Sequence, residues 1–184
     1  AEKCEKERVR LVLDECFVQF LTSGEEASMQ LETGRFRYLF VLQAFTKIYA
    51  VPGIRLGYGI SSDKALLERM ETVRQPWSVS TPAQAAGLSA LKEDHREEQT
   101  RQLVKSERER MEKELENLRI EYIPSEANFL LFNSEINWFE ELKKRGILIR
   151  DCANYRGLGN GWYRLAVRLP EENDRLLELS LIHI

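Results

Sequence analysis

The amino-acid sequence predicts an α/β fold, and two patterns carry this prediction. Short apolar runs, at residues 9–14 and 38–42, have the length and composition of buried strands. Between and after them, apolar residues recur three or four positions apart, which is typical of helices packed on a sheet. With 43% apolar residues among 184, the chain is long enough to bury a core.

The first part of the chain contains three expected strands, at residues 9–14, 38–42 and 55–60. The first ends in Asp14, the second leads to Lys47, and the third begins at Arg55. Ligands of open α/β sheets collect at strand ends, so these three side chains are expected near one another. A helix is expected over residues 62–74, with Ser61 or Ser62 as its cap.

The second part begins with a long helix and continues with alternating strands and helices. Ser80 and Pro82 are suited to the start of this helix, which continues with or without a break. Its later part has one apolar stripe: Val104, Met111, Leu115 and Leu118. Strands are then expected at residues 128–132, 147–150 and 164–168. Helices are expected before Gly146 and from Pro170 onward, the last one with Leu176, Leu177 and Leu179.

Composition argues against several classes of protein. A net charge of −3 with interspersed signs disfavours a nucleic-acid surface, because that surface is basic. No apolar run approaches the roughly 18 residues of a membrane span. Three cysteines without close spacing, and only His95 and His183 beside them, suggest neither disulfides nor zinc. We therefore expect a cytoplasmic protein.

The run from Phe45 to Gly57 is the most informative local pattern, because it combines an amine with a phosphate-binding group. The apolar neighbours of Lys47 are expected to desolvate it partly, which disfavours its charged form and favours Schiff-base chemistry. Pro52 and Gly53 predict a turn that returns Arg55 toward the lysine. The alternative is a basic surface loop, which a lysine and an arginine eight residues apart would not exclude.

Five sequence blocks, in order along the chain, resemble the fold type I pyridoxal-phosphate enzymes related to aspartate aminotransferase. The blocks are Asp14-Glu15-Cys16-Phe17, Phe45 to Gly57, Gln75-Pro76-Trp77-Ser78-Val79-Ser80, Ala127-Asn128-Phe129-Leu130-Leu131-Phe132, and Ile149-Arg150-Asp151-Cys152 through Tyr163-Arg164-Leu165-Ala166-Val167-Arg168. Within that family the chain is most similar to histidinol-phosphate aminotransferases and L-threonine-O-3-phosphate decarboxylases.

The resemblance implies the C-terminal half of a pyridoxal-phosphate-dependent transferase fold. Residues 1–85 would form part of the mixed sheet of the large, cofactor-binding domain. Residues 86–184 would form a long linking helix and a small α/β C-terminal domain. Because members of the family are about twice this long, the chain is expected to be a C-terminal fragment of a protein that forms a homodimer.

The resemblance also implies roles for the residues near the cofactor. Lys47 matches the lysine that binds the aldehyde of pyridoxal 5'-phosphate, and Asp14 matches the carboxylate that pairs with the pyridinium nitrogen. Thr46 and Arg55 match ligands of the cofactor phosphate. Phe17 departs from the tyrosine of many relatives and lacks its hydroxyl group.

For the substrate, the resemblance implies that Arg164 binds a carboxylate and that Arg150 reaches the anionic end. Asn128 matches a position near the substrate, with a structural role as its alternative, and Arg168 is a weaker candidate at a strand end. The blocks around Arg150 and Arg164 favour decarboxylation of L-threonine phosphate to aminopropanol phosphate, a step of cobalamin biosynthesis. The alternatives are histidinol-phosphate or other amino-acid transamination, and a noncatalytic fragment that lacks the N-terminal half.

Overall fold

The computed structural model describes residues 1–93 and 95–182, and it confirms an α/β fold. The chain divides into two compact units, Ala1–Arg101 and Gln102–Ile184, each with its own sheet. The assignment of residues 1–85 to the larger domain of a complete enzyme stays a prediction. In the described part of the chain, no helix is long and apolar enough to cross a bilayer.

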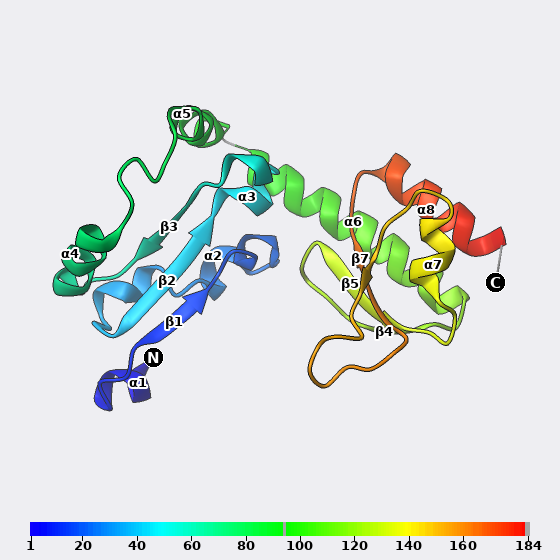
Figure 1. Ribbon diagram of the computed structural model, residues 1–184, viewed down its shortest axis with the longest axis horizontal. Coiled ribbons are helices and arrows are strands. Elements are labelled where there is room, and N and C mark those ends of the chain that lie inside the picture. The colour runs from blue at the N-terminus through cyan, green and yellow to red at the C-terminus, as the bar shows by residue number, and fades with distance from the viewer. Residues whose placement is uncertain (94, 183–184) are drawn as a thin grey trace. The chain divides into compact units, whose positions relative to one another are not determined.

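The first unit contains a mixed three-stranded sheet, in the order β1 (Leu11–Asp14), β2 (Leu39–Ala44) and β3 (Gly57–Ile60), which Figure 1 shows side by side. β1 and β2 are parallel, and β3 is antiparallel to β2. The three expected strands are therefore confirmed, although each begins one or two residues later than expected. The ends of β1 and β2 and the start of β3 all lie at one edge of this sheet.

The aromatic ring of Phe40 determines which residue type fits at position 59 of β3. A Cβ atom on Gly59 would lie 2.4 Å from Cζ of Phe40, whose side chain is buried on β2. Gly59 is opposite Leu42, so it is the diagonal cross-strand neighbour of Phe40 on the same face of the sheet. The ring therefore occupies the space that any other side chain at position 59 would need.

Short helices precede, connect and follow these strands. They are α1 (Glu2–Lys6), η1 (Val18–Phe20), α2 (Gly24–Ala27), η2 (Leu31–Gly34), α3 (Phe45–Ile48), η3 (Pro52–Ile54), α4 (Lys64–Val73) and α5 (Thr81–Ala90). The α5 cap is as expected, because the Ser80 hydroxyl accepts a hydrogen bond from the Ala83 amide at 3.3 Å. The expected cap of α4 is wrong. Asp63 caps this helix by accepting from the Leu66 amide, and the Ser61 hydroxyl instead accepts from the amide of Asp63.

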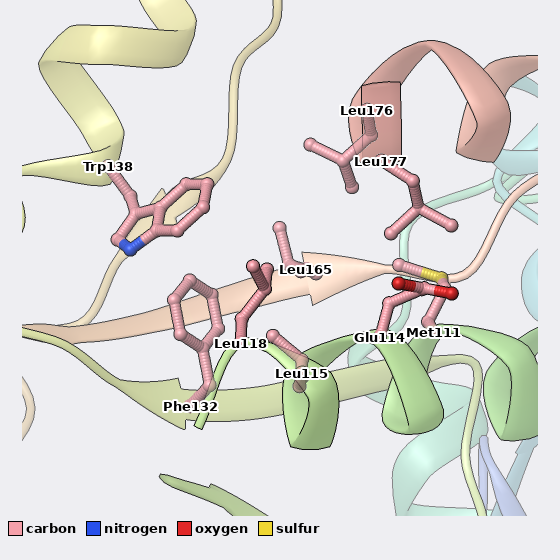
Figure 2. A pocket seen from close by; sticks show the side chains of 9 residues that line it. All are labelled: Met111, Glu114, Leu115, Leu118, Phe132, Trp138, Leu165, Leu176 and Leu177. Atoms are coloured by element: carbon pink, nitrogen blue, oxygen red, sulfur yellow. The ribbon is translucent and has the colours of Figure 1, made fainter. Parts of the chain in front are cut away.

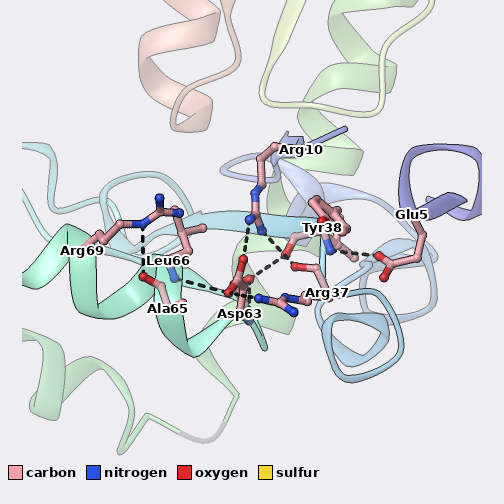
Figure 3. Close-up of polar contacts among 10 residues, drawn as sticks. Glu5, Arg10, Arg37, Tyr38, Asp63, Ala65, Leu66 and Arg69 are labelled. Carbon is pink, nitrogen blue, oxygen red and sulfur yellow. Dashed lines mark hydrogen bonds and ion pairs between the residues drawn. The ribbon is translucent and has the colours of Figure 1, made fainter. Parts of the chain in front are cut away.

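Two arginines hold the Asp63 carboxylate at the start of α4 (Figure 3). This explains why Asp63, and neither serine, caps the helix. Arg10 Nη2 lies 2.5 Å from one carboxylate oxygen, and Arg37 Nη2 lies 3.5 Å from the other. The hydrogen bond from Arg10 is the main cause that lowers the pKa of Asp63. The nearly buried carboxylate thus joins the start of β1, the turn before β2 and the start of α4.

The second unit contains an antiparallel four-stranded sheet, in the order β4 (Glu121–Ile123), β5 (Phe129–Asn133), β7 (Trp162–Ala166) and β6 (Arg150–Asp151). Its helices are α6 (Arg96–Asn117), α7 (Trp138–Lys143) and α8 (Pro170–Ile182). The sequence did not predict β4. The expected strand over residues 147–150 is wrong apart from Arg150, and β7 begins two residues before the expected position.

The core of this unit lies between α6 and the sheet, and its side chains point toward one another in Figure 2. Met111 and Leu115 of α6 meet Phe132 of β5 and Leu165 of β7, as the predicted apolar stripe requires. The remaining cavity measures about 10 Å³, which holds at most one water molecule. It is therefore a small packing gap within the core. His183 lies outside the described residues.

Candidate active site

Asp14 lies at the end of β1, where its carboxylate interacts with Cys16. Asp14 Oδ1 accepts a hydrogen bond from the Cys16 amide at 3.1 Å. Hydrogen bonds from the thiol and amide of Cys16 lower the pKa of Asp14, and the charge of Lys47 adds to this effect. Burial, together with the nearby carboxylate, raises the pKa of Cys16 to about 11. The thiol therefore stays protonated at neutral pH and acts as a donor to an ionised Asp14.

Lys47 lies in α3, directly after β2, and its ammonium group faces an aromatic ring. The distance from Nζ to the centre of the Phe17 ring is 5.1 Å, which allows a cation–π interaction. The expected desolvation of Lys47 is wrong, because the side chain is exposed. Its apolar neighbours pack elsewhere: the rings of Phe45 and Tyr49 stack on each other, and Ile48 points into the core.

Arg55 follows the expected turn and adopts the left-handed conformation, with φ 58°. This conformation is uncommon for a residue other than glycine, asparagine or aspartate. It returns the chain to α3, because the Phe45 amide donates to the Leu56 carbonyl at 3.2 Å. Thr46 follows Phe45 and Arg55 precedes Leu56, so both residues adjoin this hydrogen bond. The structure thus brings the predicted Asp14, Thr46, Lys47 and Arg55 to the same edge of the sheet.

The second unit brings together two of the predicted substrate arginines. Arg150 of β6 and Arg164 of β7 are direct cross-strand partners. Each guanidinium lies over an aromatic ring, Arg150 at 5.6 Å from the centre of Tyr155 and Arg164 at 5.1 Å from that of Phe129. Within the described residues, neither arginine forms an ion pair with a carboxylate. Like charges directly opposite on a sheet destabilise it, so the pair favours binding of an anion.

The third predicted substrate residue, Asn128, immediately precedes β5. Its carbonyl accepts a hydrogen bond from the Val167 amide at 2.9 Å, and its side chain is half-buried. The side chain of Arg168 is engaged differently, because it forms an ion pair with Glu172 at 2.7 Å. Strand alternation is as expected, since Leu165 and Val167 are buried on the opposite face from these arginines.

Sequence reasoning assigned no role to Cys16, Phe129 or Tyr155, although each contacts a predicted site residue. Cys16 and Phe129 stand two residues and one residue after Asp14 and Asn128, so both lie inside blocks that the sequence had already singled out. Tyr155 follows Arg150 by five residues in an irregular loop. Only the fold of that loop brings its ring beneath the guanidinium.

The fold and the positions of these residues define a class of protein. The chain belongs to the aminotransferase class I and II family, whose model matches residues 1–179. It is 36% identical to the threonine-phosphate decarboxylase of Salmonella typhimurium, over 96% of this chain and 49% of that protein. It is also 36% identical to histidinol-phosphate aminotransferase 1 of Archaeoglobus fulgidus, over 91% of this chain and 50% of that protein.

A solved structure gives the same result at the level of the fold. The histidinol-phosphate aminotransferase from Clostridium acetobutylicum superposes with a TM-score of 0.90 and 30% identity. The match covers 97% of this chain and 55% of that one. The chain thus spans about half the length of the relatives that it matches.

Proposed function

We propose that these residues belong to a pyridoxal-phosphate-dependent enzyme that removes CO2 from L-threonine O-3-phosphate and yields aminopropanol phosphate. Two relatives named as threonine-phosphate decarboxylases, from Salmonella typhimurium and Caldanaerobacter subterraneus, are 36% and 35% identical and match 96% of this chain. In this proposal the complete protein is a cytoplasmic homodimer that acts in cobalamin biosynthesis.

The residues at the edge of the first sheet fit this cofactor chemically. The Asp14 carboxylate, whose pKa is lowered, stays ionised and can hold the proton of a pyridinium nitrogen. Lys47 supplies an accessible amine for the aldehyde, and Thr46 and Arg55 supply donors for the phosphate. When bound, pyridoxal phosphate withdraws electrons from the bond that is broken. The protein's part is to orient the substrate and to move protons at its Cα through Lys47.

The proposal of an anionic substrate rests on the cross-strand pair of Arg150 and Arg164. Two guanidinium groups without a carboxylate partner among the described residues suit a substrate that carries a carboxylate and a phosphate. Each group can bind such an anion through two parallel hydrogen bonds. Asn128, close to the same sheet, is proposed to contact the substrate.

Transamination of histidinol phosphate is the second candidate, and a relative in the sequence comparison supports it. Histidinol-phosphate aminotransferase 1 of Archaeoglobus fulgidus is 36% identical over 91% of this chain, as high an identity as that of the Salmonella typhimurium decarboxylase. Fold similarity does not separate the two reactions, because two histidinol-phosphate aminotransferases superpose with TM-scores of 0.90 and 0.72 and an L-threonine-O-3-phosphate decarboxylase with 0.80. The two reactions differ in which bond at Cα is broken.

Two measurements on the complete protein test the proposal. Borohydride reduction followed by peptide mapping is expected to place the pyridoxyl group on Lys47; attachment to Lys64 would contradict the cofactor assignment. With L-threonine phosphate, the protein should release CO2 without added 2-oxoglutarate, because decarboxylation returns the cofactor to its starting form. Turnover of histidinol phosphate that requires 2-oxoglutarate, without CO2 release, would support the second candidate. The 184 residues alone, assayed in parallel, would show whether they are a noncatalytic fragment.

A further inference from the structure

Two neighbouring charged residues of α6, Glu107 and Arg108, are buried within the second unit. Their exposed fractions are 8% and 7%. Burying a charged group is unfavourable unless it is paired, and apolar replacements of buried ion pairs are often as stable or more stable. Stability alone therefore does not explain why this face of α6 carries two charges.

Glu107 acts on the backbone that follows β7, through Asn173. The Asn173 amide nitrogen donates to Glu107 Oε2 at 2.7 Å and to the Arg168 carbonyl at 2.9 Å. Its amide oxygen accepts from the Arg168 amide at 3.1 Å. Asn173 is 1% exposed, and Arg110 completes the pairing of Glu107 at 2.7 Å. Both the backbone amide and the backbone carbonyl of Arg168 are thus hydrogen-bonded to the side chain of Asn173.

Arg108 acts on the backbone that precedes β5. Its Nη1 donates to the carbonyl of Ala127 at 3.2 Å. Its Nε lies 3.9 Å from Glu112 Oε1, and neither atom has a hydrogen-bond partner among the described residues. The Glu112 carboxylate therefore does not form a hydrogen bond with Nε of the Arg108 guanidinium. Its contact with a carbonyl group places it one residue from Asn128.

Both contacts lie next to one hydrogen bond, which the Val167 amide donates to the Asn128 carbonyl at 2.9 Å. Arg108 holds the residue before Asn128, and the Glu107–Asn173 pair holds the residue after Val167. We propose that Arg108 is a positioning residue that sets the place of Asn128 relative to β7. This inference rests on the proposed function, in which Asn128 contacts the substrate. Arg108 itself is buried beneath the backbone and is not a catalytic residue.

Arg108→Lys in the complete protein tests this proposal, because lysine keeps the charge but lacks the planar group that reaches Ala127. Hydrogen exchange of the Val167 amide should accelerate about tenfold, as expected for loss of a charge-assisted hydrogen bond that supports its acceptor. Exchange in the rest of the β5–β7 ladder should change little. The KM for L-threonine phosphate should rise by about the same factor, with kcat nearly unchanged. Lys105→Gln, on the exposed face of α6, is the matched control.

A double-mutant cycle separates positioning from general stability. In an Asn128→Ala background, Arg108→Lys should no longer raise KM, because the residue through which it acts is absent. A KM effect that persists in that background, or an unchanged rate of Val167 exchange, would overturn the proposal. The exchange measurement needs no turnover. If L-threonine phosphate is not a substrate, exchange therefore still decides the role of Arg108, and the failure belongs to the proposed reaction.

Discussion

Arg150→Gln should leave the stability of the complete protein nearly unchanged at low salt and at the same time weaken substrate binding. Arg150 and Arg164 are cross-strand partners, and opposite residues on a sheet have Cβ atoms about 5 Å apart. Arg150 is exposed, so the dielectric constant of water applies. Two positive charges about 7 Å apart then repel each other by about 0.6 kcal/mol. Removal of one charge relieves this repulsion but also loses the cation–π contact with Tyr155, which is worth about 0.5–1 kcal/mol at an exposed site, so the two effects should nearly cancel at low salt.

The same change removes one guanidinium from the proposed anion site. Binding of L-threonine phosphate should weaken by about 2 kcal/mol, which corresponds to a rise in KM of about 30-fold. Urea unfolding measures the first effect and steady-state kinetics the second. In 1 M NaCl, salt screens the repulsion between the exposed charges, so the lost cation–π contact should dominate and the variant should be less stable than the wild type.

Arg156→Gln is the matched control, since Arg156 is an exposed arginine in the loop between the same two strands. It should change neither quantity. If Arg150→Gln lowered the free energy of unfolding at low salt by much more than about 1 kcal/mol, the guanidinium would be stabilised by interactions other than those described. If KM stayed unchanged, the arginine pair would not be the anion site.

Three further changes test other parts of the structure. Asp14→Asn should abolish most turnover yet change unfolding in urea little, because the exposed carboxylate acts on the cofactor; normal turnover would exclude its assigned role. Phe132→Ala should destabilise the second unit by about 3–5 kcal/mol in chemical denaturation, because this buried ring fills its core. Asp63→Asn should be destabilising at neutral pH. Because the folded-state pKa of Asp63 is lowered, this difference from wild type should persist above its unfolded pKa of about 3.9 and vanish as pH falls through the folded value. A pH-independent difference would show that its charge does not matter.

The predictions that succeeded depended on local patterns. Strands β1 and β2 follow from short apolar runs, and the edge that gathers Asp14, Lys47 and Arg55 follows from the order of strand ends. The capping hydroxyl of Ser80, followed by a proline at the start of α5, also gives a local signal.

The predictions that failed depended on distant contacts. Ser61, Ser62 and Asp63 could each cap α4, and the choice is made by Arg10, more than 50 residues away. The apolar neighbours of Lys47 predicted desolvation, but a sequence does not show toward which side each ring packs. The pairing of Arg150 with Arg164 is likewise a matter of strand register, which residues 147–149 did not reveal because they do not form a strand.

The close approach of the Phe40 ring to Gly59 constrains how this family can diverge. A side chain at position 59 requires the buried Phe40 ring to shift or to be replaced by a smaller side chain, since its Cβ would overlap the ring. In an alignment of relatives, a residue larger than glycine at position 59 should therefore occur together with a small residue at position 40. Because one nucleotide substitution changes only one of these codons, the intermediate sequence would carry either a clash or a cavity. The pair should consequently covary along lineages and change rarely.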